Sequence, residues 1–215
     1  MKILKLSSKN QKEIIEEVRK AIKEEKVIVL PTDTVYGLVC DATNEKAVEK
    51  VFKIKRRKIG KPIPIFIKDL KMAKKLAFVD KRQEKFLKKM WPGKVTVILR
   101  PKRLQPTLLP PVPSGGPAGP YKFPKGIGKP KKEIGLRIPN YKMINQLLLN
   151  INRPLTGTSA NISGMPPSTK IKEVLKQFKN QKYQPDLVID VGNLKPSKPS
   201  TVIDITTSPP KILRQ

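Results

Sequence analysis

Hydrophobic residues recur at helical spacing in several parts of the chain. Residues 10–25 carry the stripe of an amphipathic helix, made by Ile14, Ile15, Val18, Ala21 and Ile22. Asn10 and Glu13 stand at its start with the spacing of a capping pair. The same period predicts further helices after the N-cap residues Asn44, Asp69 and Asp80, around residues 144–148, and from the Ser168–Glu173 capping position to Phe178.

Runs of β-branched and other apolar residues alternate with these helices. They predict strands at residues 27–30, 63–67, 95–100, 134–138, 187–191, 201–205 and 211–213, and a short strand running into residues 158–161. The last two of the longer strands are close enough along the chain to pair as a hairpin. This order of elements predicts an α/β fold with a mixed parallel and antiparallel sheet and flanking helices.

Residues 101–132 interrupt the pattern. They contain nine prolines and five glycines, which favour neither a helix nor a strand ladder. We therefore expect residues 1–215 to form a single domain with a basic insertion loop at about 101–132. An untethered linker is the simpler interpretation of this loop. A lid or an RNA-contacting arm is the alternative, because the loop carries Tyr121 and Phe123.

Charge and composition narrow the possible functions. Lys and Arg number 46 against 17 Asp and Glu, a formal charge of +29. This excess favours polyanionic partners such as nucleic acid, nucleotides or an anionic surface, although a general enrichment in lysine gives the same count. The sequence has no histidine and one cysteine, Cys40, which excludes Ser-His-Asp chemistry, His-dependent zinc sites and a disulfide framework. Any catalysis must use Lys, Arg, Asp, hydroxyl groups and the backbone.

Hydropathy also bears on location. The first ten residues have too short an apolar core for a signal peptide. No stretch approaches the ~18 consecutive apolar residues of a membrane span. We expect a cytoplasmic protein with no membrane partner.

Polar side chains gather where predicted strands end or begin. Thr32, Asp33, Thr34 and Tyr36 follow the strand at 27–30. Comparable positions on other strands hold Arg137, Ser159, Asn161, Ser200, Thr201 and Arg214. In α/β proteins the rim outside the strand ends is where small ligands bind, and this favours a shared site. The alternative is that these groups only cap turns.

Residues 51–64 place a dense basic segment between a helix end and the next strand, with Lys55, Arg56, Arg57, Lys58 and Lys61. Strand-like alternation predicts that Lys55 and Arg57 point into a cleft while Arg56 and Lys58 point to solvent. Polyphosphate is a natural partner for such a segment, and a solvated basic turn is the alternative. No Walker motif and no G-x-G-x-x-G after a strand is present, which excludes ordinary P-loop and dinucleotide sites.

Taken together, these motifs resemble the YrdC/Sua5 family. The resemblance is carried in order by P-T-D-T-V-Y-G-L at 31–38, Lys55 and Arg57 with Lys61-Pro62, W-P-G at 91–93, G-L-R-I-P at 135–139, T-S-A-N-I-S-G at 158–164, and S-T-V-I-D at 200–204 followed by I-L-R. It covers essentially the whole chain except the insertion. The chain looks like the short form of the family, without the additional C-terminal domain of longer members.

The resemblance implies a YrdC-like twisted sheet with a concave basic cleft. It also implies L-threonylcarbamoyladenylate synthase activity, which forms threonylcarbamoyl-AMP and pyrophosphate from L-threonine, bicarbonate and ATP. Mg²⁺ would arrive with ATP as the substrate complex, and no metal site on the protein is expected. The product would feed the t6A modification of tRNA through a transferase machinery, and contact with tRNA or double-stranded RNA is a further implied partner.

Matching the family's motifs assigns roles to individual residues. The implied catalytic residues are Lys55 and Arg57. The L-threonine contacts would be Thr32, Thr34, Arg137 and Ser200, with Arg137 suited to the carboxylate. The ATP contacts would be Arg57, Lys61, Ser159, Asn161 and Arg214. The chain departs from the family at Phe66, where many members carry a histidine that touches threonine.

Two alternatives remain open at the level of sequence. The same fold could serve an RNA-binding or ribosome-maturation factor, since family members have been linked to double-stranded RNA. A carbamoyl-adenylate-forming enzyme of the hydrogenase-maturation or antibiotic type is the second alternative. Such proteins carry extra domains that this chain lacks.

Overall fold

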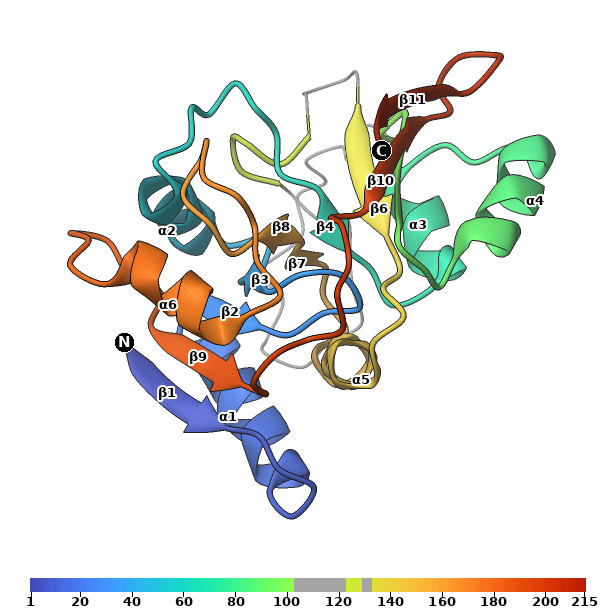
Figure 1. Cartoon of the computed structure of the whole chain (residues 1–215). Coiled ribbons are helices and arrows are strands. Elements are labelled where there is room, and N and C mark those ends of the chain that lie inside the picture. Colours follow the sequence, from blue (N-terminus) through green and yellow to red (C-terminus); the bar gives the residue numbers. More distant parts are fainter. Residues whose placement is uncertain (103–122, 129–132) are drawn as a thin grey trace, which may run out of the picture.

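The strands of the computed structural model, which describes residues 1–102, 123–128 and 133–215, form two separately hydrogen-bonded sheets (Figure 1). The first sheet has the strand order β1 (Lys2–Lys5), β9 (Leu187–Asp190), β2 (Ile28–Leu30), β3 (Gly37–Val39) and β8 (Thr158–Ser159). The second has the order β11 (Lys211–Arg214), β10 (Thr201–Asp204), β5 (Val95–Leu99), β6 (Ile134–Arg137), β4 (Ile65–Phe66) and β7 (Leu155–Thr156).

Both sheets mix parallel and antiparallel pairs. In the first sheet β9 is parallel to β1 and β2, whereas β3 is antiparallel to β2 and β8. In the second sheet β10 is parallel to β5 and antiparallel to β11, which confirms the predicted terminal hairpin. The mixed α/β class is therefore confirmed, but the strands divide between two sheets where the sequence pattern predicted one. Strand periodicity shows which face is buried and does not reveal which strands pair.

Helices flank the sheets. They are α1 (Gln11–Lys23), α2 (Glu45–Lys55), α3 (Leu70–Leu76), α4 (Lys81–Met90), α5 (Lys142–Ile151) and α6 (Ile171–Phe178). Figure 1 shows α1 and α6 beside the first sheet and α3 and α4 beside the second. None of the helices within the described ranges combines the length and hydropathy that a bilayer-spanning helix requires.

Most of the predicted N-caps are present. The side chains of Asn44, Asp69 and Asp80 accept hydrogen bonds from backbone N–H groups in the first turns of α2, α3 and α4. Asn10 stands at the N-cap position of α1 as predicted, but its side chain does not cap the helix, because its oxygen accepts from the backbone and hydroxyl of Ser7. The short strands β1 and β3 were not predicted, since their three or four residues carry little periodicity.

The chain passes from one sheet to the other at Gly157, between β7 and β8. Its N–H donates to Pro64 O at 2.8 Å, and a Cβ at this position would lie 2.8 Å from Cε1 of Phe66. Only glycine allows so close an approach. The two sheets therefore meet beside the Phe66 ring. The predicted insertion at 101–132 lies mostly outside the described residues.

Candidate functional site

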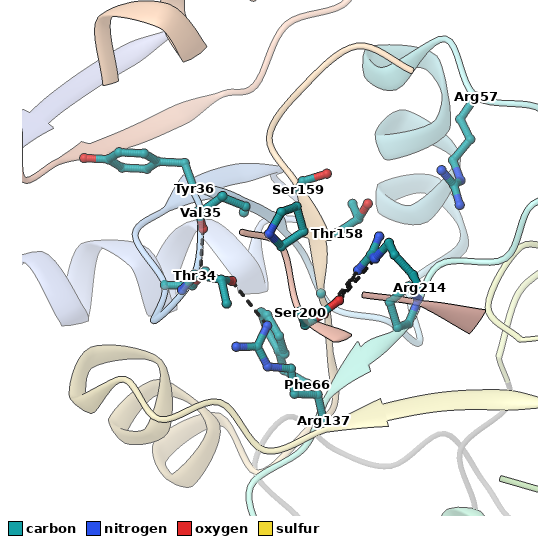
Figure 2. Close-up of a pocket in the computed structure, with 15 residues that line it drawn as sticks. Thr34, Val35, Tyr36, Arg57, Phe66, Arg137, Thr158, Ser159, Ser200 and Arg214 are labelled. Atoms are coloured by element: carbon teal, nitrogen blue, oxygen red, sulfur yellow. Dashed lines mark hydrogen bonds between the residues drawn. The ribbon is translucent and has the colours of Figure 1, made fainter. Parts of the chain in front are cut away.

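A cavity opens where strands of both sheets end (Figure 2). It contains about 550 Å³ of empty space, part of which is continuous with solvent. Its lining includes most of the predicted site residues: Thr32, Thr34, Arg57, Arg137, Ser159, Ser200 and Arg214. These residues come from segments that are far apart in the sequence. The interpretation of the strand ends as a shared rim agrees with this placement.

One end of the cavity is built around Arg137, the last residue of β6. Arg137 is only 4% exposed. Its Nη2 forms an ion pair with Asp33, its Nε donates to Gly93 O at 2.9 Å, and its Nη1 lies 3.4 Å from the Thr34 hydroxyl. Burial lowers the pKa of Arg137, and the Asp33 carboxylate opposes that shift. The remaining N–H groups of this guanidinium have no partner among the described residues, so they are available to a ligand.

The neighbouring threonines form a directed hydrogen-bond chain. The Thr32 hydroxyl donates to Val35 O at 2.7 Å, so its single proton is used there. Thr32 Oγ1 must then accept both from Thr34 N and from the Thr34 hydroxyl, each at 3.0 Å. The Thr34 oxygen is consequently left as an acceptor toward Arg137 and the cavity. The sequence marked both threonines as site residues, but only the fold shows that Thr32 orients Thr34.

The other end of the cavity carries Arg57 and Arg214. Figure 2 shows both guanidinium groups directed toward the same part of the cavity. Arg57 donates to the backbone oxygens of Lys61 at 2.8 Å and Pro62 at 3.1 Å. Arg214 donates to Ser200 O at 2.8 and 3.1 Å and to Ser200 Oγ at 3.2 Å. Among the described residues no carboxylate pairs with either arginine.

This arrangement leaves uncompensated positive charge. Burial lowers the pKa of both Arg57 and Arg214, and the charge of Arg214 lowers the pKa of Arg57 further. Guanidinium groups held by carbonyl oxygens keep further N–H groups for a planar oxyanion. The Arg57 end therefore suits a multiply charged anion, whereas the Arg137 end has its charge balanced by Asp33. Whether the surrounding surface forms the expected concave basic cleft stays a prediction.

Lys55 does not line the cavity, and the strand-like conformation predicted for residues 55–58 is wrong. Arg57 does line the cavity, and Arg56 and Lys58 are exposed, as predicted. Lys55 ends α2, and Arg56 follows it in the left-handed conformation with φ 49°. The Lys55 side chain is 2% exposed and its Nζ donates to Ser159 O at 2.5 Å, Asn161 O at 2.8 Å and Asn161 Oδ1 at 3.0 Å. Burial, followed by the charge of Arg57, lowers the pKa of Lys55 to about 7. Three acceptors around one amine favour its protonated form against this shift.

Asn161 and Lys61 also lie outside the cavity lining. Asn161 accepts from the Ser159 hydroxyl at 2.6 Å and donates to Ile162 O and Met165 O, so its amide is engaged in the loop. Lys61 is exposed, and its backbone oxygen accepts from Arg57. Lys55 and Asn161 thus support Ser159 from behind. Residue type and spacing could not separate these supporting groups from the groups that face the cavity.

Phe66 occupies the floor of the cavity and is 3% exposed. The Arg137 guanidinium lies over its ring, with the central carbon 5.7 Å from the ring centroid (Figure 2). A cation over an aromatic face is attracted to it, and the ring keeps water from the buried side of Arg137. Tyr36 lines the site as a member of the predicted polar rim, and Phe66 does so at the position where many family members contact threonine. Thr158 and Pro199 also line the site but were not assigned to it from the sequence, where the motif residues beside them were the only signal.

The described residues contain no group of three or more His, Cys, Asp or Glu side chains that could hold a metal ion. Asp33 is the carboxylate next to the cavity, and both of its oxygens already accept hydrogen bonds. The charged groups that face the cavity are arginines, which bind anions. The site is therefore suited to anionic groups of a ligand.

The model of the family Sua5_yciO_yrdC, described as telomere recombination, matches residues 20–215. The chain belongs to the Sua5/YciO/YrdC family. This confirms the resemblance drawn from the motifs. The match includes every residue that lines the cavity.

Some relatives within the family are named for an enzymatic activity, and others are not. The chain is 37% identical to a putative threonylcarbamoyl-AMP synthase of Methanocaldococcus jannaschii over 95% of this chain and 86% of the relative. The solved structure of Pyrococcus abyssi Sua5 complexed with L-threonine matches with a TM-score of 0.76 and 29% identity, over 99% of this chain and 56% of that one. Escherichia coli YciO matches with a TM-score of 0.78 and 26% identity, over 100% of this chain and 94% of that one. The chain thus spans little more than half of the Pyrococcus protein and nearly all of YciO.

Proposed function

We propose that this protein is an L-threonylcarbamoyladenylate synthase, a nucleotidyltransferase that joins L-threonine, bicarbonate and ATP. The observation that carries the proposal is the division of one cavity into a charge-balanced end at Arg137 and an unbalanced end at Arg57 and Arg214. A zwitterionic amino acid suits the first end and a polyphosphate suits the second. The name of the Methanocaldococcus jannaschii relative supports the same activity.

In this proposal L-threonine binds at the Arg137 end. The unpartnered N–H groups of Arg137 would hold the threonine carboxylate, and the hydroxyls of Thr34 and Ser200 would orient the bound amino acid. Thr32 would contribute by fixing the Thr34 hydroxyl. The complex of Pyrococcus abyssi Sua5 with L-threonine supports an amino-acid site in this fold.

ATP would bind across the Arg57 end. Arg57 and Arg214 would bind phosphate oxygens, and Ser159 on β8 would line the same part of the cavity. Lys55 and Asn161 would act by holding Ser159 and its loop, and the exposed Lys61 would reach the phosphates from outside the cavity lining. Mg²⁺ would come with ATP as part of the substrate, because the described residues supply no set of metal ligands.

The proposed reaction needs no covalent protein intermediate. The threonine amine attacks the bicarbonate carbon, water leaves, and a carbamate forms. A carbamate oxygen then attacks the α-phosphorus of ATP, and pyrophosphate leaves as the P–O bond to it breaks. The protein's work is to hold the reactants close and to stabilise the charge on the phosphates, which arginines can do in a chain without histidine.

The product, threonylcarbamoyl-AMP, would supply the t6A modification of tRNA. This assigns the protein to a cytoplasmic pathway with a transferase machinery as its downstream partner. Direct contact with tRNA is part of the proposal as well, because a formal charge of +29 would attract a polyanion.

The experiment that tests the proposal measures pyrophosphate release. The full chain is incubated with ATP, Mg²⁺, bicarbonate and each amino acid in turn. We expect release that requires both bicarbonate and L-threonine. Absence of threonine-dependent release contradicts the proposal, and it is the result expected for the alternative function, an RNA-binding factor that uses the same fold.

A further inference from the structure

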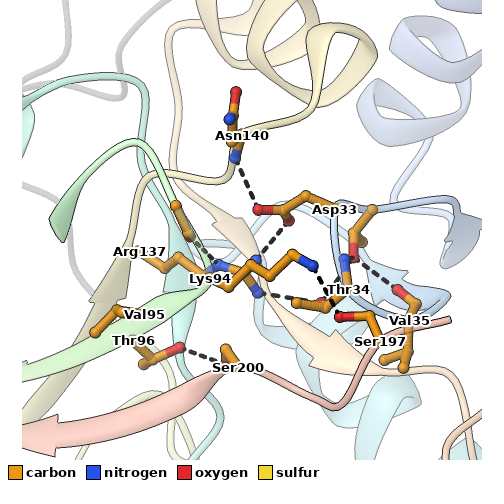
Figure 3. A network of polar contacts seen from close by, with 12 residues as sticks. Asp33, Thr34, Val35, Lys94, Val95, Thr96, Arg137, Asn140, Ser197 and Ser200 are labelled. Atoms are coloured by element: carbon orange, nitrogen blue, oxygen red, sulfur yellow. Dashed lines mark hydrogen bonds and ion pairs between the residues drawn. The ribbon is translucent and has the colours of Figure 1, made fainter. Parts of the chain in front are cut away.

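Asp33 lies behind the cavity wall and does not line the cavity itself. Its side chain is 7% exposed. One carboxylate oxygen pairs with Arg137 Nη2, and the other accepts from Asn140 N at 3.0 Å (Figure 3). Asp33 therefore links the turn after β2 to the guanidinium at the end of β6, 104 residues further along the chain, and to the segment that leads into α5.

The Asp33 carboxylate has two physical effects on Arg137. First, a guanidinium held at Nη2 by Asp33 and at Nε by Gly93 O cannot rotate, so the N–H groups that remain point in fixed directions. Second, the pair carries no net charge, in contrast to Arg57 and Arg214 at the other end. A neutral pair with oriented donors attracts one carboxylate group and gives no general attraction for a polyphosphate.

We infer that Asp33 is a positioning residue that fixes the donors of Arg137 and reserves this end of the cavity for the amino acid. The inference rests on the proposed function, because it takes the ligand at Arg137 to be L-threonine. Asp33 itself touches no substrate. Its effect reaches the substrate through the orientation and the charge of Arg137.

Asp41 provides a matched control. It is a buried aspartate that pairs with Arg153 Nη1 at 3.0 Å and accepts from a backbone N–H, that of Thr43, at 2.8 Å. It does not line the cavity. Asp41→Asn therefore removes the same kind of buried charge from a comparable network. A loss of ligand affinity that Asp33→Asn and Asp41→Asn share is a general structural effect.

The experiment compares wild type, Asp33→Asn and Asp41→Asn in binding of L-threonine and of a non-hydrolysable ATP analogue, measured by calorimetry. Asparagine can still accept from Arg137, but its amide is neutral and places N–H donors beside Asn140 N. We expect Asp33→Asn to raise the threonine Kd by about 10- to 100-fold, the scale of a misplaced binding group, and the analogue Kd by no more than about twofold. Asp41→Asn should leave both constants within about twofold of wild type.

A second measurement follows Arg137 without any ligand. Its Nε–H donates to Gly93 O, so we expect an NMR resonance protected from exchange in wild type, assigned by its loss in Arg137→Lys, and unprotected in Asp33→Asn. Three results in Asp33→Asn would overturn the inference: an unchanged threonine Kd, an equal rise in the Kd of both ligands, or an Arg137 resonance that stays protected. If Asp33→Asn does not fold, Asp33→Glu with Asp41→Glu as control replaces the pair, because the longer side chain keeps the charge and misplaces it.

These measurements separate the two proposals. Threonine binding without pyrophosphate release in wild type would contradict the proposed function and leave the threonine comparison valid as a test of Asp33. If wild type binds no threonine, the proposed function fails, and the Arg137 resonance alone decides whether Asp33 positions it.

Discussion

The two ends of the cavity hold their arginines in different ways. Arg137 is almost fully buried, carries a carboxylate partner and lies on an aromatic ring. Arg57 and Arg214 are less buried than Arg137, and backbone oxygens hold both, with no carboxylate partner among the described residues. One end is prearranged before any ligand arrives, whereas the other keeps its charge available.

This difference matches what the two proposed substrates require. A small amino acid offers one carboxylate, so its site gains from donors that are fixed in advance. A triphosphate carries several charges along a flexible chain, and its site gains from positive charge that nothing else neutralises. The comparison teaches that residues of one type can serve opposite purposes, depending on the partners that the fold gives them.

The largest effect expected from the difference between the two ends is on the free energy of unfolding. Arg137→Ala leaves the Asp33 carboxylate buried without its charge partner, and we expect the free energy of unfolding to fall by about 3–5 kcal/mol. Urea denaturation measures it. Arg153→Ala is the control, because Arg153 is 42% exposed in its ion pair with Asp41 and water can replace it at smaller cost. Equal decreases in the free energy of unfolding of the two variants would contradict the expectation that the buried Arg137–Asp33 pair is the costlier one to break.

The second largest expected effect is on pyrophosphate release, and it comes from the Arg57 end of the cavity. Arg57→Ala should lower threonine-dependent pyrophosphate release by about 100- to 1,000-fold, because it removes a donor to charge on the phosphates. Its free energy of unfolding should change by only about 1 kcal/mol, since the partners of Arg57 within the described part of the chain are backbone oxygens of its own loop.

The neighbouring residue Arg56 supplies the control for Arg57. Arg56 is exposed and bonds to Gln181 outside the cavity, so Arg56→Ala should keep release within about twofold of wild type. Titration of both variants with RNA at several salt concentrations distinguishes the alternative function. Similar partial losses of salt-dependent affinity for the two, with no release in wild type, would favour an RNA-binding surface.

The smallest effect is a pH dependence near the Arg57 end. Burial and the charge of Arg57 lower the pKa of Lys55 from 10.5 to about 7. Between these values the unfolded chain binds a proton that the folded protein releases, so the free energy of unfolding should rise with pH, by at most about 1.4 kcal/mol per unit. Above about pH 9 this rise should stop and above about pH 10 it should reverse, since burial raises the pKa of Cys40 and then that of Tyr36 to about 12.

Urea denaturation at about pH 7, 8 and 9 measures this slope. The absence of histidine leaves few other groups that titrate in this range. Lys55→Met should flatten the dependence. The expectation is contradicted if the free energy of unfolding still rises with pH in Lys55→Met, or if it does not change with pH in wild type. Either result would mean that the three oxygens around the amine keep Lys55 protonated in the folded protein.

Local patterns in the sequence determined much of the fold. The helical stripe in residues 10–25, the N-caps at Asn44, Asp69 and Asp80, and most of the longer strands depend on neighbours within a few positions, and the structure contains them. The polar groups at strand ends were visible for the same reason. A strand that stops at a polar cluster places that cluster at the edge of a sheet wherever the sheet lies.

Only the tertiary structure decided which partners these groups meet. The pairing of Asp33 with Arg137 spans 104 residues, and the sequence contains no local signal for it. Lys55 and Lys61 belong to one basic segment, yet one is buried against Ser159 and the other is exposed. Charge and periodicity are properties of neighbouring residues, whereas burial and ion pairing depend on how distant strands are ordered in two sheets. The sequence by itself therefore determined which segments reach the site, and the fold decided which of their residues face a ligand.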